Sequence, residues 1–88
     1  MFPNIITIIV GKRRESSMKL QEVLSHYGCH IQTRVGFHET VKTSGVCSDV
    51  GLVILQTTGD KKETDKMIKE INKIKEVKAK RLIMTLDD

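Results

Sequence analysis

The chain has 88 residues, of which 39% are apolar and 30% charged, with a formal net charge of +4. These values are typical of one globular domain, residues 1–88, with a thin core, because a chain of this size buries only about 60–65% of its unfolded surface. The longest apolar run, residues 5–10, is too short to cross a bilayer, and no signal-peptide pattern accompanies it. The two cysteines, Cys29 and Cys47, indicate reduced thiols in a cytoplasmic protein rather than a disulfide framework.

The first half of the chain predicts a strand, a helix and a second strand. Asn4–Val10 is β-branched on both faces, which is typical of a central strand covered on both sides. A helix is expected at about residues 17–27, with Ser16 or Ser17 as its N-cap and Gly28 as a left-handed C-terminal cap. Its apolar stripe consists of Met18, Leu20, Val23, Leu24 and Tyr27. Ile31–His38 alternates apolar and polar residues, as an edge strand does.

The second half repeats this order after a loop at residues 39–49. Residues 50–56 are again apolar on both faces, and Asp60 or Thr64 can cap a second helix at residues 64–74. A closing strand is expected at residues 77–84, where the alternation changes phase near Arg81. A β-bulge at Arg81 would reconcile the two phases.

The two halves match with an offset of about 46 residues, which gives the order βαββαβ. This order predicts an α+β, ferredoxin-like fold, in which a four-stranded antiparallel sheet carries two helices on one face. The first and third strands then lie in the middle, and their second apolar face is left open. Because a monomer seldom exposes a large contiguous apolar patch, we expect another copy to cover this face, in a dimer or tetramer.

A basic turn suggests one candidate binding site. Gly11, Lys12, Arg13 and Arg14 precede a helix N-terminus, where backbone amides and the helix dipole favour an anion such as phosphate or carboxylate. The turn is not a phosphate-binding loop, because the second glycine and the Gly-Lys-Ser/Thr ending are missing. Nucleic acid is not expected as a partner, because the central strands offer no aromatic platform for base stacking.

A cluster of soft ligands suggests an alternative, a nickel or zinc sensor. His26, Cys29 and His30 lie where the first helix ends, and His38 ends the next strand. The chain has no paired CxxC, and the spacing of these residues alone does not close a tetrahedral site. It also lacks an evident Ser/His/Asp set or carboxylate dyad, so an enzyme is not expected and no cofactor is required.

Two short motifs carry a family resemblance. Arg34, Val35 and Gly36 form an arginine, an apolar residue and a glycine in the expected second strand. Residues 52–55 and 58–60 form an apolar third strand and the Thr/Gly/Asp turn that follows it. In these motifs the chain resembles the small ACT-like family of iron-only hydrogenase system regulators. The resemblance implies an ACT-like fold related to the C-terminal domain of the nickel-responsive repressor, assembly into dimers or tetramers, and a regulatory role without catalysis.

The chain also departs in two places from the families that it resembles. Amino-acid-binding ACT domains have an acidic residue and a Pro-Gly element after the first strand, where this chain has Gly11 and three basic residues. No DNA-binding segment precedes the first strand, so regulation would act through a partner protein or a small-molecule effector. We expect the ligand site at a subunit interface, near the Gly11 turn, near Arg34 and Gly36, or near residues 40–49.

Overall fold

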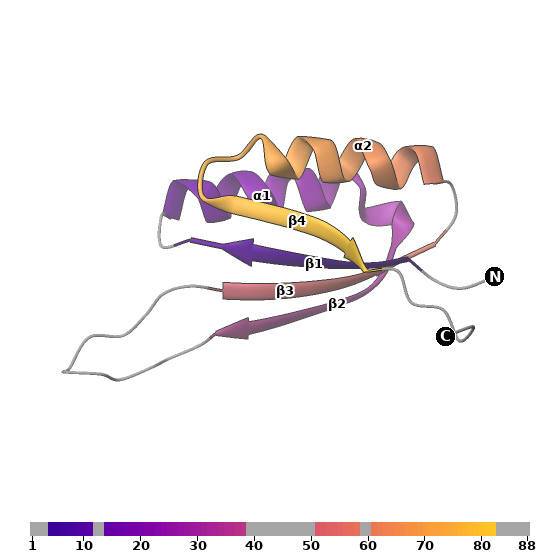
Figure 1. The fold of residues 1–88 in the computed structure, drawn as a ribbon, viewed down its shortest axis with the longest axis horizontal. Helices are drawn as coiled ribbons and strands as arrows, with labels where there is room; N and C mark the ends of the chain where they lie inside the picture. Colours follow the sequence, from indigo (N-terminus) through magenta and orange to yellow (C-terminus); the bar gives the residue numbers. More distant parts are fainter. Residues whose placement is uncertain (1–3, 12–13, 39–50, 59–60, 83–88) are drawn as a thin grey trace.

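The computed structural model describes residues 4–11, 14–38, 51–58 and 61–82. Their elements are β1 (Asn4–Val10), α1 (Arg14–His26), the 3-10 turn η1 (Gly28–His30), β2 (Ile31–His38), β3 (Gly51–Thr57), α2 (Lys61–Asn72) and β4 (Val77–Leu82). The four strands form one antiparallel sheet in the order β2-β3-β1-β4, with both helices on the same face (Figure 1). The predicted ferredoxin-like α+β fold is therefore confirmed, with β1 and β3 in the middle and β2 at an edge.

Both helices begin earlier than predicted. Because α1 starts at Arg14, Ser16 and Ser17 lie inside its first turn, and neither is the N-cap. In the same way α2 starts at Lys61, which places Thr64 inside the helix, and Asp60 lies outside the described residues. The first turn of each helix is polar in sequence, so apolar periodicity does not predict that it is helical. Ser16 and Thr64 in these turns are nevertheless buried.

The helix-to-strand connection after α1 also differs from the prediction. Gly28 does not adopt a left-handed conformation; it opens the 3-10 turn η1, in which the His30 N–H donates to the Tyr27 carbonyl at 2.9 Å. The turn is tied to the sheet because the Thr58 N–H donates to the His30 carbonyl, also at 2.9 Å. The residue with a left-handed backbone is Glu76, with φ 61°, just before β4.

The predicted bulge at Arg81 is wrong. β4 pairs with β1 in one unbroken register, from Val77 opposite Val10 to Leu82 opposite Ile5. Val77, Ala79 and Arg81 therefore face the helices, while Leu82 lies on the open face with the lysines of this strand. The irregularity lies instead in β2, between Ile31 and Thr33.

The core lies between the helices and one face of the sheet. Its buried apolar residues are Ile6, Ile8, Val10, Leu20, Leu24, Tyr27, Leu55, Met67, Ile71, Val77 and Ala79. Met18, which the sequence pattern places on the apolar stripe of α1, is 58% exposed. The buried side of α1 runs through Ser16, Leu20 and Leu24. Because an α-helix turns by about 100° per residue, Met18, two positions after Ser16, points about 200° away from that residue.

A side-chain amide joins α2 to the edge strand β4. The Asn72 Nδ2 group donates to the Ala79 carbonyl at 3.1 Å, and the Ala79 N–H donates to Asn72 Oδ1 at 2.8 Å. Both backbone groups of a buried residue on an edge strand are thus satisfied by one side chain, which also blocks strand addition at this point.

Replacing Asn72 with alanine is expected to lower the free energy of unfolding by about 1–3 kcal/mol, because the Ala79 N–H and carbonyl lose their partners. Urea unfolding followed by circular dichroism measures this loss. Lys73→Ala, at the next position, is the control and should change the stability by less than about 0.5 kcal/mol. Equal stabilities of the two variants would contradict a role for the amide.

No helix within the described ranges is long and apolar enough to span a membrane.

Candidate functional site

The face of the sheet opposite the helices is the candidate binding surface. Its rows follow from the strand register: Val35, Ile54, Thr7 and Lys80 lie side by side across the four strands. The row toward one end holds Leu52, Ile9 and Lys78, and the row toward the other holds Thr33, Gln56, Ile5 and Leu82. No helix lies over these rows in Figure 1. We call this surface the open face.

Apolar side chains dominate the open face. Ile9 is 55% exposed, and Val35, Leu52 and Leu82 are exposed as well, whereas Ile5 and Ile54 are half-buried by their neighbours. The described residues of this face include no acidic side chain, and its two lysines lie on β4 alone. The surface is therefore an apolar centre with a basic margin on one side.

The basic turn between β1 and α1 is only partly described. Lys12 and Arg13 lie outside the described residues, and Arg14 is exposed at the start of α1. Gly11 packs against the turn before β4: its N–H donates to the Glu76 carbonyl at 2.8 Å, and an added Cβ would lie 2.8 Å from the Glu76 Cβ. A glycine is therefore required here by close approach, independently of any ligand.

The structure does not bring Arg34 and Gly36 to this turn. Both lie on β2, and β3 separates that strand from β1. The Arg34 Nη2 group donates a hydrogen bond to Gln21 Oε1 on α1, so this arginine faces the helices rather than the open face. Gly36 is exposed, and an added Cβ would meet nothing within 4 Å. The two predicted binding elements are therefore separate within one chain.

The predicted metal ligands are not assembled either. His26 is exposed at the end of α1, Cys29 is exposed in η1, and His30 is half-buried; the side chain of His38 lies outside the described part. Within the described ranges, no group of three or more His, Cys, Asp and Glu side chains could hold a metal ion. His26 instead meets the ring of Tyr27 edge-on, with 5.0 Å between ring centroids.

Tyr27 follows α1 and interacts with Glu70 on α2. A surface hollow of ≈ 450 Å³ between the helices is lined by Glu22, Val23, His26, Glu70 and Lys73. The Tyr27 ring belongs to the core. Burial raises the pKa of the Tyr27 hydroxyl above 10.0, and Glu70 raises it further through a hydrogen bond and its negative charge, with a smaller effect from the charge of Glu63. A neutral hydroxyl thus acts as a donor to the α2 carboxylate.

Tyr27 is the chain's one tyrosine and there is no tryptophan, so its ionisation can be followed by ultraviolet absorption alone. We expect the folded protein to titrate at a higher pH than the unfolded protein in urea, because the pKa is raised on folding. The stability that this group contributes is present below pH 10.0 and is lost as pH rises through its folded pKa. A folded midpoint at or below the unfolded one would contradict this prediction, and the Tyr27→Phe variant should lose the absorption change altogether.

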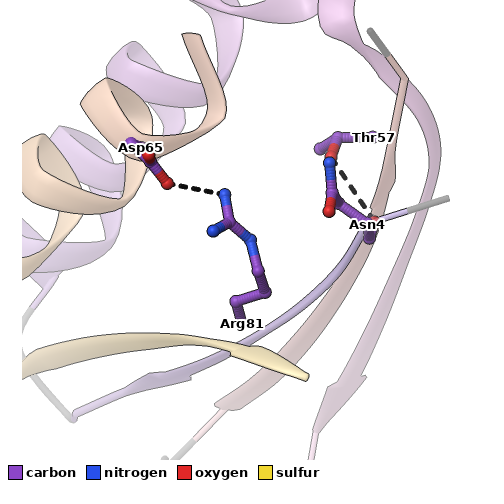
Figure 2. Close-up of polar contacts among 4 residues, drawn as sticks. All are labelled: Asn4, Thr57, Asp65 and Arg81. Atoms are coloured by element: carbon purple, nitrogen blue, oxygen red, sulfur yellow. Dashed lines mark hydrogen bonds and ion pairs between the residues drawn. The ribbon is translucent and has the colours of Figure 1, made fainter. Parts of the chain in front are cut away.

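One polar pair was not anticipated from the sequence. This pair is Arg81 and Asp65: the Arg81 Nη2 group lies 2.7 Å from Asp65 Oδ1 on α2 (Figure 2). Figure 2 also shows a separate hydrogen bond, in which the Thr57 hydroxyl donates to the Asn4 carbonyl at 3.4 Å. The Arg81 side chain is only 17% exposed, and within the described residues its Nε is buried without a partner. Its stem lies on the helix side beside Ile6, which explains why a charged residue occupies an apolar position of the strand pattern.

The comparisons establish the fold. No protein-family model and no curated protein matches the sequence. Among solved structures, the chain is similar to that of the uncharacterized protein TM1266 from Thermotoga maritima, with a TM-score of 0.79 and 19% identity. The match covers 96% of this chain and 98% of that chain, so the likeness extends over both molecules from end to end.

Proposed function

We propose that this chain is a non-catalytic regulatory domain that works as a homo-oligomer joined through the open face. The observation that supports the proposal is the contiguous apolar centre of this face, formed by Ile5, Ile9, Leu52 and Ile54 on the two central strands. Small domains bury a limited fraction of their surface and gain stability by association.

The size of the open face is sufficient for a specific interface. Four strands spaced about 4.8 Å apart and about 20 Å long present roughly 400 Å². Two stacked faces, with the relief of their side chains, bury on the order of 1,000 Å², which is about the lower limit for a stable protein interface. A second copy also matches the chemistry of the face, since it brings an apolar surface of the same size.

The regulatory part of the proposal rests on the resemblance to the iron-only hydrogenase system regulators, a family of ACT-like domains. Residues 34–36 and 52–55, which carry that resemblance, lie on β2 and β3. A domain of this kind would act in the cytoplasm, in keeping with a chain that has only two cysteines, by responding to a small effector or by binding a partner protein.

Size-exclusion chromatography with light scattering tests the assembly. The expected mass at micromolar concentration is a multiple of 10.0 kDa, and a constant 10.0 kDa over the whole concentration range would refute the proposal. A thermal-shift screen of amino acids, nucleotides and metal ions tests effector binding, because a ligand of the folded state raises the melting temperature. A screen without any response would remove the effector and leave a partner protein as the route of regulation.

A further inference from the structure

The open face carries its positive charge at one edge only. Lys78 and Lys80 lie on β4, whereas the described open-face residues of β2, at the opposite edge, are uncharged and include Thr33 and Val35. The two edge strands are three strand spacings apart, which is about 14 Å. The stability of two stacked copies therefore depends on which edges meet.

Two-fold symmetry allows two aligned ways of stacking this face on itself. Packed sheets usually keep their strand directions within about 30° of each other, so the two-fold axis between the faces runs close to along the strands or close to across them. An axis along the strands places β4 over β2 of the partner subunit, and β1 over β3. An axis across the strands places β4 over β4, and β2 over β2.

The lysines of β4 distinguish the two arrangements. With β4 over β4, the ammonium groups of Lys78 and Lys80 from both copies gather at one edge of the interface. The described open-face residues supply no carboxylate there, and like charges brought together across an interface weaken it. With β4 over β2, each pair of lysines faces uncharged side chains, and the two pairs lie at opposite edges.

The axis along the strands also brings apolar side chains together. Such an axis leaves the position along the strands unchanged, so each row of the open face lies over the same row of the partner subunit. Leu52 on β3 and Ile9 on β1 share one row. Leu52 therefore faces the partner's Ile9, and Ile9 faces the partner's Leu52, which gives two apolar contacts between the central strands.

The polar side chains of the central strands have hydrogen-bond partners within their own sheet. The Thr7 hydroxyl donates to the Lys80 carbonyl at 3.3 Å. The Gln56 Nε2 group donates to Gln32 Oε1 at 3.1 Å. Both groups keep a hydrogen bond when water leaves the face, so they oppose stacking less than unpaired polar groups would.

We infer that two copies of this chain stack their open faces with β4 of each copy over β2 of the other, about a two-fold axis along the strands. This inference rests on the proposed function, since it assumes that the open face joins the copies. Val35 then faces the partner's Lys80, and Thr33 faces the partner's Leu82, because the members of each pair share a row.

Cross-linking of single-cysteine variants tests this arrangement with both lysines of β4 in place. Cys29 and Cys47 are first replaced with serine, and Thr33→Cys, Val35→Cys and Leu82→Cys are made in separate chains. A bismaleimide of roughly 10 Å, the spacing between packed sheets, joins only cysteines that face each other. We expect mixed Thr33→Cys and Leu82→Cys chains to cross-link. Val35→Cys should not cross-link to itself, because its two copies lie about 17 Å apart.

Charge variants at Val35 provide a second test. Val35→Glu places a carboxylate opposite the partner's Lys80, and Val35→Lys places an ammonium group there, with a similar loss of apolar area. The dissociation constant of Val35→Lys should be about tenfold above that of Val35→Glu, because each dimer contains two such contacts. This difference should largely disappear when Lys80→Gln is added. The matched control is Met18 on α1, where glutamate and lysine variants should dimerise alike.

Light scattering of the chain without cysteines separates this inference from the proposed function. A constant mass of one chain, or an oligomer in which none of the three cysteine positions cross-links, overturns both. Self-cross-linking of Val35→Cys, or equal dissociation constants for Val35→Glu and Val35→Lys, overturns the arrangement alone. Cross-linking of Thr33→Cys to Leu82→Cys without self-cross-linking at position 35 supports it.

Discussion

Replacing Ile9 with glutamate is expected to convert the proposed oligomer into a folded monomer. Ile9 is 55% exposed on the open face, on the central strand β1, where a second copy would have to bury the new carboxylate. Removing that charge from water in an apolar interface, once in each copy, should raise the dissociation constant at least about a hundredfold, or roughly 3 kcal/mol. The monomer should remain folded, because Ile9 is opposite Lys78 on β4, and the glutamate gains an oppositely charged cross-strand neighbour.

Light scattering measures the mass of the variant, and circular dichroism checks its fold. The matched control is Met18→Glu, since Met18 is 58% exposed and lies on α1, on the other side of the sheet. That variant changes the net charge equally but should keep the mass of the wild type. If Ile9→Glu also keeps the mass of the wild-type oligomer, the open face is not the interface.

The second large effect is expected from Ile8→Ala, which should lower the free energy of unfolding by about 2–5 kcal/mol. Ile8 is fully buried, with Val53 and Ala79 as its neighbours across the strands and both helices above it. The substitution removes apolar contacts and leaves a cavity that close-packed neighbours cannot fill. For a domain whose total stability is of the order of 5–15 kcal/mol, this is a large part of the whole.

The adjacent residue provides the control for this experiment. Ile9→Ala makes the same chemical change on the same strand, but on the open face, so at concentrations where the chain is monomeric its cost should be below about 1.5 kcal/mol. In the oligomer the cost of Ile9→Ala should grow with protein concentration, whereas that of Ile8→Ala should not. Urea unfolding at two concentrations measures both effects. Similar losses for the two variants in the monomer would mean that the two faces of β1 are equally covered within one chain.

The apolar pattern of β1 illustrates what could be predicted before the structure. Asn4–Val10 and Ile31–His38 were predicted with the bounds that the structure has, because strand period and β-branched residues are local properties of the chain. The order of elements then predicted the sheet, since few topologies accommodate βαββαβ. Residues 5–10 also predicted that β1 is apolar on both of its faces, which is the property that makes the open face apolar.

The candidate sites were less predictable. Arg34 with Gly36 and the Gly11 turn are alternative predicted places for a ligand; within one chain β3 separates them, and Arg34 bonds to Gln21 on α1. Arg81 was expected at a bulge, although it keeps the register and pairs with Asp65, 16 residues away along the chain. Such pairings depend on which helix turn faces which strand residue, and no local pattern encodes that relation.

By itself, the sequence determined the order of the elements, the two central strands and the excess of apolar surface on them, because these follow from composition and periodicity along the chain. Tertiary structure alone decided that Ser16 is a buried residue that lines a small cavity with Lys75 rather than a helix cap. The physical reason is that a cap is defined by where backbone hydrogen bonding begins, and a cavity by residues from distant turns that packing brings together. The apolar strands are therefore a property of the chain, whereas the buried position of Ser16 is a property of the fold.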